Sequence, residues 1–168
     1  MSDATEDIMS GDFTAGDGEL LFVPLGGSGE IGMNVNLYGC NGKWIMVDLG
    51  ISFSDPYYPG TDLVLPDLEF IESNAEDLLG IVLTHGHEDH IGAIPWLAEE
   101  LGVPLYATKF TAGLIRYKLR EHGLEKEIEL NVIEDDGHFQ LGDFGIRYVP
   151  LAHSIAEGNA LLIETPYG

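Results

Sequence analysis

The sequence predicts a domain of mixed α/β class in which helices cover the outer faces of the sheets. The chain of 168 residues contains 22 glycines and 8 prolines, which divide it into many short elements, and 45% of its residues are hydrophobic. Apolar runs of strand length also alternate with helix-spaced segments through the middle of the chain. A chain of this length can bury one sizeable core, so we expect one compact unit.

The first folded residues are predicted to form antiparallel strands. Leu20–Pro24, Asn34–Tyr38 and Lys43–Asp48 are β-prone runs, and the pair Asn41-Gly42 is a strong hairpin signal because both residues tolerate a positive φ. The stretch 27–32 matches the G-x-G-x-x-G pattern of dinucleotide-binding turns. That function requires a helix directly after the glycines, whereas a hairpin is predicted there, so we interpret the glycines as a tight strand-to-strand turn.

The rest of the chain is predicted to alternate between helices and strands. Residues 51–65 contain proline turns and are expected to form an ordered loop with little regular structure. A helix is predicted at 67–79, capped by Asp67 and ended by Gly80, and a strand buried on both faces at 81–83. Further predicted elements are a helix at 94–101 ended by Gly102, a strand at 103–107, a helix at 108–122 with a Thr108 cap and Gly123 at its end, and strands at 128–133, 139–141, 146–151 and 160–165.

The chain is strongly acidic, with a formal net charge of −22. Phosphate binding normally depends on lysine and arginine, so the charge alone argues against a nucleic-acid partner. Residues 1–18 are predicted to be a disordered acidic tail and residues 19–168 the folded domain. A single cysteine, no signal peptide, and no apolar run of about 20 residues predict a cytoplasmic protein that does not enter a membrane.

The segment from Thr84 to His90 places three imidazoles and two carboxylates directly after the predicted strand at 81–83. In an extended segment, residues two apart project to the same side, so His85 and His87 can hold one ion. Asp89 and His90 then fall on the turn into the next helix, where they can bind a second ion beside the first. Imidazole nitrogens with one or two carboxylates suit zinc, and manganese is the alternative. The spacing therefore predicts a metal centre.

The pattern His-x-His-x-Asp-His after a short apolar strand resembles the motif of the metallo-β-lactamase fold. The resemblance implies an αββα sandwich. It places His153 on the first metal with His85 and His87, and it places Asp89 and His90 on the second. More specific segments resemble the ribonuclease J family of β-CASP nucleases: Pro24–Asn34, Met46–Gly50, Asp62–Asp67 and His90–Ala93.

This second resemblance implies a hydrolase that degrades and matures RNA, as a 5′-to-3′ exonuclease and as an endonuclease. It implies two zinc ions that activate a water, with Asp89 placed to accept a hydrogen bond from that water, and it suggests a homo-oligomer. The family also supplies, after the position of Gly168, two more metal ligands, the β-CASP lobe that clamps RNA, and the strands that complete the sandwich. We therefore expect this chain to be the N-terminal half of the sandwich, with weak or no activity by itself. No substrate-binding residue is predicted.

The sequence leaves alternatives open for one residue pair and for the function. Asp48 either orients a metal-bound histidine, or binds a structural calcium ion together with the carbonyl of Gly50 as in some family members, or is a solvated turn acid. The function is that of a ribonuclease, of a small-molecule hydrolase of the same fold such as a thioesterase, or of a non-catalytic metal-binding module. A thioesterase would lack the nuclease-like opening segment, and metal binding without hydrolysis would favour the module.

Overall fold

The structure is a computed structural model that describes residues 16, 18–53, 60 and 62–168. The predicted disordered tail, residues 1–18, therefore lies outside the described residues except for Gly16 and Gly18, which are both exposed. Within the described part of the chain, no helix combines the length and the apolar character needed to cross a membrane.

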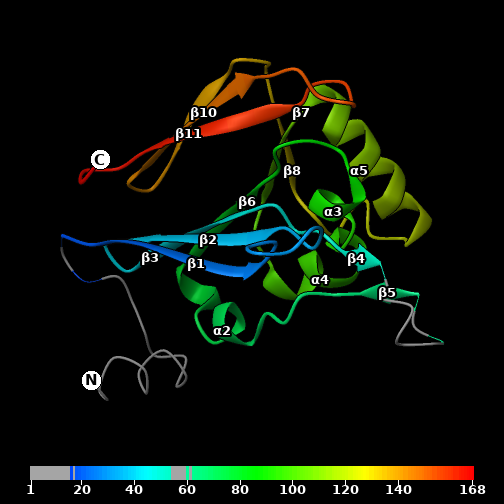
Figure 1. The fold of residues 1–168 in the computed structure, drawn as a ribbon, viewed down its shortest axis with the longest axis horizontal. Helices are drawn as coiled ribbons and strands as arrows, with labels where there is room; N and C mark the ends of the chain where they lie inside the picture. Colours follow the sequence, from blue (N-terminus) through cyan, green and yellow to red (C-terminus); the bar gives the residue numbers. More distant parts are fainter. Residues whose placement is uncertain (1–15, 17, 54–59, 61) are drawn as a thin grey trace.

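The described chain forms three layers, with helices on one side of a six-stranded sheet and a three-stranded sheet on the other (Figure 1). This arrangement confirms the predicted α/β class and two-sheet architecture. The large sheet has the strand order β1-β2-β3-β6-β7-β8, and the small sheet has the order β11-β10-β9. The strands of the large sheet are β1 (Leu20–Gly26), β2 (Val35–Cys40), β3 (Lys43–Val47), β6 (Leu78–Val82), β7 (Leu105–Thr108) and β8 (Leu130–Ile133). The other elements are β9 (His138–Leu141), β10 (Phe144–Pro150), β11 (Asn159–Glu164), α2 (Glu69–Glu72), η1 (Ala75–Asp77), α3 (Glu88–Ile91), α4 (Ile94–Leu101) and α5 (Lys109–Glu121).

The large sheet is antiparallel at its N-terminal end and parallel beyond β3. β1, β2 and β3 pair antiparallel, whereas β6, β7 and β8 add in parallel. The predicted hairpin is confirmed, since Asn41 and Gly42 join β2 to β3 with φ of 50° and 72°. A strand and not a helix follows the glycines at 27–32, as predicted. In the parallel part, the carboxyl ends of β3 and β6 meet at one edge of the sheet, and this edge carries the metal-binding motif.

Each face of the large sheet packs against its own hydrophobic core. Trp44, Met46 and Ile81 face the helices, where they pack with buried residues of α2, α4 and α5. Their neighbours Ile45 and Val82 face the small sheet and pack with its buried side chains. Successive side chains of a strand point to opposite faces, so strands that are covered on both sides are apolar at nearly every position.

The predicted helix at 67–79 is wrong in its second half. The structure has only the short helix α2 and the turn η1 there, and Leu78 already begins β6. Leu78 pairs in parallel with Trp44 of β3, and this long-range pairing overrides the local helical spacing of leucines. Gly80 does not end a helix but lies within β6, where a Cβ atom would come within 2.8 Å of the Tyr106 ring. The glycine thus allows close side-chain packing between adjacent strands.

The later helices follow the prediction closely. α4 has the predicted bounds, and Gly102 and Gly123 follow α4 and α5 with positive φ of 63° and 78°. Thr108 occupies the N-cap position of α5, as predicted. Its side chain makes no cap hydrogen bond, and the buried hydroxyl has no partner among the described residues. In the predicted loop at 51–65, the short strands β4 (Ser52–Phe53) and β5 (Leu63–Val64) pair antiparallel, while residues 54–59 and 61 lie outside the described residues.

Candidate metal centre

The metal-binding motif lies in the tight connection between β6 and α3. Strand β6 ends at Val82, and α3 begins at Glu88 with His87 as its N-cap residue. The strand delivers His85 into the interior, where only 6% of its surface is exposed. Gly86 lets the turn pack closely on α5, because a Cβ atom at this position would lie 2.5 Å from Leu114 Cδ1 and would displace that side chain. The local sequence therefore turns the chain sharply while keeping the histidines at one edge of the sheet.

Three imidazoles converge at this edge, and one of them comes from a distant loop. His85 Nε2 lies 3.1 Å from His87 Nδ1 and 3.0 Å from His153 Nε2. One nitrogen from each of the three rings lies within 4.8 Å of the other two. His153 follows β10, and Gly158 packs directly against it, since a Cβ atom at Gly158 would lie 2.6 Å from the His153 Cβ. The structure thus brings together the three residues that the family resemblance placed on the first metal.

The chemistry of this cluster fits a bound cation. Burial, followed by the charges of neighbouring imidazoles, lowers the pKa of His85 to about 4, so this ring is neutral at neutral pH and keeps a lone pair. Tetrahedral ligands with bonds of roughly 2.0–2.1 Å to zinc are spaced roughly 3.3 Å apart, close to the observed nitrogen separations. Nitrogens this close compete for the same protons, whereas a divalent cation between them would use every lone pair. The fold and the cluster together indicate a divalent metal site.

Asp89 and His90 form a pair beside the three imidazoles. His90 Nε2 lies 3.4 Å from Asp89 Oδ2, and His90 Nδ1 lies 2.7 Å from Asp48 Oδ2. The Asn34 amide donates to the Asp89 carbonyl at 3.1 Å and to Asp89 Oδ2 at 3.2 Å. The Asn34 amide nitrogen also lies 3.2 Å from His90 Nε2, so the Asp89 carboxylate and this edge of the His90 ring meet the same amide group. The group of three converging ligands found among the described residues does not include this pair, so its role at a second metal remains a prediction.

Asp48 anchors the hydrogen bonds behind both parts of the centre. Its carboxylate accepts bonds from the Thr84 backbone N–H at 2.8 Å and from the Thr84 hydroxyl at 2.9 Å. Because the Thr84 hydroxyl donates its only proton to Asp48, it must accept the hydrogen bond from His85 Nδ1, 2.9 Å away. Asp48 can likewise only accept from His90 Nδ1. These bonds turn the Nε2 atom of each ring toward the centre.

The same contacts remove one of the three alternatives that the sequence left open for Asp48. Asp48 is only 3% exposed, so the interpretation as a solvated turn acid is wrong. Burial lowers the pKa of His90, but the hydrogen bond and the charge of Asp48 outweigh it, and the net pKa is raised. The contacts favour the interpretation in which Asp48 orients metal-binding histidines. The alternative role in a structural calcium site stays a prediction.

The role of Gly50 is visible in its packing against the motif. A Cβ atom at Gly50 would lie 1.7 Å from the carbonyl oxygen of Asp89, which no side chain can tolerate. Backbone hydrogen bonds surround this contact: Leu49 N–H donates to the His90 carbonyl at 2.8 Å, and Ile51 N–H donates to the Glu88 carbonyl at 3.1 Å. The segment after β3 is therefore a fixed backing for the metal-binding turn.

Sequence reasoning missed Thr84 and Asn34 as residues of the site. Thr84 directly precedes His85, so its place within the motif was the available signal. Asn34 ends the family-like segment Pro24–Asn34, but no spacing pointed to its contact with Asp89, which lies 55 residues later in the chain. It reaches the site because the segment between β1 and β2 folds back: Asn34 N–H donates to the Asp89 carbonyl, and Met33 N–H donates to the Ile51 carbonyl.

Comparison with known proteins identifies relatives of this chain. The family model described as the metallo-beta-lactamase superfamily matches residues 29–159. The chain is 44% identical over 158 residues to ribonuclease J of Sinorhizobium meliloti, covering 92% of this chain and 28% of that protein. It is 40% identical over 146 residues to ribonuclease J of Helicobacter pylori, covering 86% of this chain and 21% of that protein. The chain thus spans about a quarter of the length of these relatives.

Solved structures support the same fold. A crystal structure of a protein of unknown function from Enterococcus faecalis matches with a TM-score of 0.64 and 23% identity, over 88% of this chain and 41% of that one. A crystal structure described as a diphosphatase from the PhnP family matches with a TM-score of 0.52 and 20% identity, over 78% of this chain and 48% of that one. At these identities, the similarity concerns the fold alone.

Proposed function

Because the chain belongs to the metallo-β-lactamase superfamily and matches ribonuclease J over most of its length, we propose that it supplies metal-binding residues of a metal-dependent ribonuclease. The reaction is hydrolysis of RNA phosphodiesters, with 5′-to-3′ exonuclease and endonuclease modes. The observation that carries this proposal is the convergence of His85, His87 and His153 on one point beside Asp89 and His90.

Zinc is the proposed metal, with manganese as the alternative. Three imidazole nitrogens suit zinc better than the hard cations magnesium and calcium, which prefer oxygen ligands. Two such ions, when bound, supply a water of lowered pKa and offset negative charge on the phosphate oxygens.

The residues of the chain have separate roles in this proposal. His85, His87 and His153 hold the first ion, and Asp89 and His90 contribute to the second. The Asp89 carboxylate also accepts a hydrogen bond from the attacking water and so aligns it. The Asn34 amide, at 3.2 Å from Asp89 Oδ2, holds that carboxylate in place.

The net charge of −22 limits where RNA phosphates can bind. Four of the seven lysines and arginines already form ion pairs with carboxylates: Lys43 with Asp77, Lys118 with Glu88, Arg120 with Glu125, and Arg147 with Asp136. Metal ions at the centre are then the strongest positive charges available to a phosphate group. Phosphate binding by this chain should therefore depend on the metal.

The first test is the metal content of the purified chain. Elemental mass spectrometry should find zinc or manganese at about one ion per chain, held by the three imidazoles. A His85→Ala/His87→Ala double variant should lose this ion, whereas a His122→Ala control, whose ring packs on Trp96 and not at the centre, should keep it. No bound metal in the folded wild-type chain would contradict the proposed site.

The second test addresses the reaction. The matching 158-residue segment of the Sinorhizobium meliloti ribonuclease J can be replaced by this chain. We expect the folded hybrid to degrade RNA, and His87→Ala in the inserted segment to abolish that activity. A folded, metal-loaded hybrid that cleaves a thioester but not RNA would overturn the ribonuclease proposal in favour of a small-molecule hydrolase.

A further inference from the structure

An apolar hollow of about 520 Å³ adjoins the metal centre. Ile31 and Phe53 form its exposed apolar wall, and the buried Ile51 lies behind them. His87 and Asp89 line it on the side of the metal centre. The hollow is therefore continuous with the place where a reacting phosphate would bind.

The exposure of this wall is unusual for residues of its kind. Ile31 is 98% exposed and Phe53 is 66% exposed, although both are large and apolar. Grouped apolar side chains beside a polar centre are typical of a ligand-binding surface. The turn that presents Ile31 is fixed from behind, because Met33 N–H donates to the Ile51 carbonyl at 2.8 Å.

The charges around the hollow identify the kind of group that fits. Among the described residues, its lining includes the carboxylates of Glu88 and Asp89 but no lysine or arginine. Lys118 pairs with Glu88 at 2.7 Å and so offsets one of these charges without facing the hollow as a free cation. An anionic phosphate is disfavoured there, whereas an uncharged flat group can cover Phe53.

We propose that this hollow binds the nucleobase of the nucleotide next to the scissile phosphate, stacked on Phe53 and bordered by Ile31. The inference rests on the proposed ribonuclease function, because a nucleobase is separated from the phosphate by a single sugar. Stacking on an aromatic ring accepts every base, so the hollow would add affinity without requiring a particular sequence. Phe53 and Ile31 are then substrate-binding residues that the sequence analysis did not predict.

The test compares two ligands that differ only by the base. Adenosine 5′-monophosphate and ribose 5-phosphate are titrated by calorimetry into the zinc-loaded chain. We expect the nucleotide to bind on the order of tenfold more tightly, as found for stacking of one base on an aromatic side chain. Phe53→Leu should remove most of this ratio and leave the affinity for ribose 5-phosphate unchanged. Ile31→Ser, at an almost fully exposed position, should lower the ratio as well.

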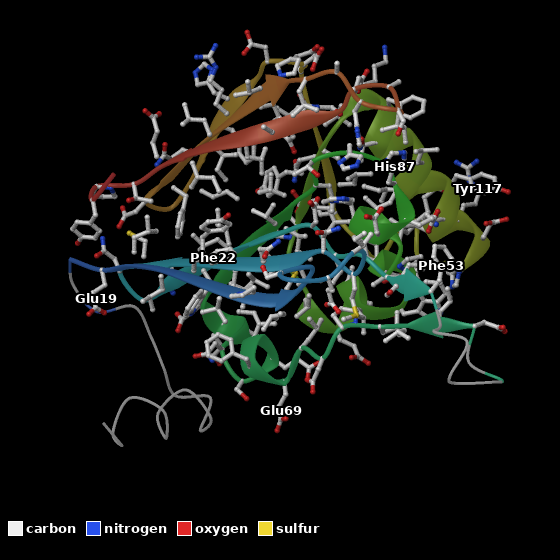
Figure 2. The ribbon with its side chains drawn as sticks, viewed as in Figure 1. Glu19, Phe22, Phe53, Glu69, His87 and Tyr117 are labelled. Atoms are coloured by element: carbon white, nitrogen blue, oxygen red, sulfur yellow. The ribbon has the colours of Figure 1, made fainter. Side chains whose placement is uncertain are left out.

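Phe22→Leu provides the matched control. Phe22 is also an exposed phenylalanine on a strand, 53% exposed, but it packs on Tyr38 of β2 and does not line the hollow (Figure 2). This variant should keep the wild-type ratio. Equal affinities of the wild-type chain for the two ligands would overturn the base-binding proposal and leave the proposed function standing. An affinity ratio between the two ligands that is unchanged in Phe53→Leu would do the same. Absence of zinc, or absence of phosphate binding, would instead contradict the proposed function. Adenosine binding to the zinc-free chain that is weakened by Phe53→Leu would still support the hollow.

Discussion

Replacing Gly50 by alanine should disrupt the metal-binding turn, because the backbone of the turn lies directly against this glycine. The added Cβ atom would lie 1.7 Å from the Asp89 carbonyl oxygen and 2.2 Å from its carbon. Cβ atoms essentially never approach other heavy atoms closer than 3.0 Å. The two segments must therefore separate by at least 1.3 Å, the difference between 3.0 and 1.7 Å. The φ of Gly50 is not in the left-handed region, so the effect is steric and not conformational.

The magnitude follows from the hydrogen bonds that this separation would break. Gly50 N–H donates to the Asn34 carbonyl at 3.1 Å, and the bonds from Leu49 to His90 and from Ile51 to Glu88 lie on either side. Each buried backbone hydrogen bond contributes about 1 kcal/mol, and overpacking adds about 1–3 kcal/mol. With three such bonds lost, we expect the free energy of unfolding to fall by about 4–6 kcal/mol, which is about 8–24 °C in Tm for a chain of this size.

Thermal unfolding measures the loss of stability, and competition for zinc against a chromogenic chelator measures the loss of metal affinity. The displaced Asp89 and His90 should also weaken metal binding by about 10–100-fold, as found when supporting residues of a metal site are altered. Gly113→Ala is the control, because Gly113 is exposed on helix α5 with no atom within 4 Å of an added Cβ. That variant should gain up to about 1 kcal/mol of stability from helix propensity. A Gly50→Ala chain with wild-type Tm and zinc affinity would refute this reasoning.

Three further predictions concern buried polar groups. The hydroxyl of the fully buried Tyr148 has two acceptors for its one proton, the Tyr106 carbonyl at 3.0 Å and the Leu83 carbonyl at 3.1 Å. Tyr148→Phe should therefore cost about 1–3 kcal/mol in urea unfolding, and an unchanged midpoint would show that the hydroxyl contributes nothing. Asp48→Asn should weaken zinc binding about 10–100-fold by competition assay, since it disturbs the proton positions on His85 and His90; loss of calcium binding alone would favour the calcium alternative. The metal-free chain should lose stability as the pH falls from 6.5 to about 4, because over this range the unfolded chain binds a proton at His85 that the folded chain does not. The raised pKa of His90 acts at higher pH, where the stability of the folded chain should fall as the pH rises through the folded pKa of His90. In thermal melts recorded across pH, His85→Gln should remove only the loss of stability between pH 6.5 and about 4.

Local sequence determined the elements whose physical causes lie within a few neighbouring residues. The Asn41-Gly42 turn, the bounds of α4 and the glycines after α4 and α5 were predicted correctly, because positive φ and helix ends depend on local backbone geometry. Spacing also predicted that the four motif residues from His85 to His90 lie at one edge of the sheet, since a strand end followed by a turn places them there.

Tertiary structure decided the features that depend on pairing between distant segments. The leucines at 78 and 79 fit a helix or a strand equally well, and only pairing with β3, more than 30 residues earlier, makes them part of β6. His153 lies 68 residues after His85, so its meeting with His85 follows from the packing of the small sheet on the large one. Asn34 and the apolar wall of Ile31 and Phe53 likewise reach the centre through backbone contacts between separate loops. Spacing along the chain determines which metal-binding side chains of one short segment can lie together. The bonds that Asn34 and Asp48 make to the motif, and the approach of His153, join segments that are far apart in the sequence, so no local pattern predicts them.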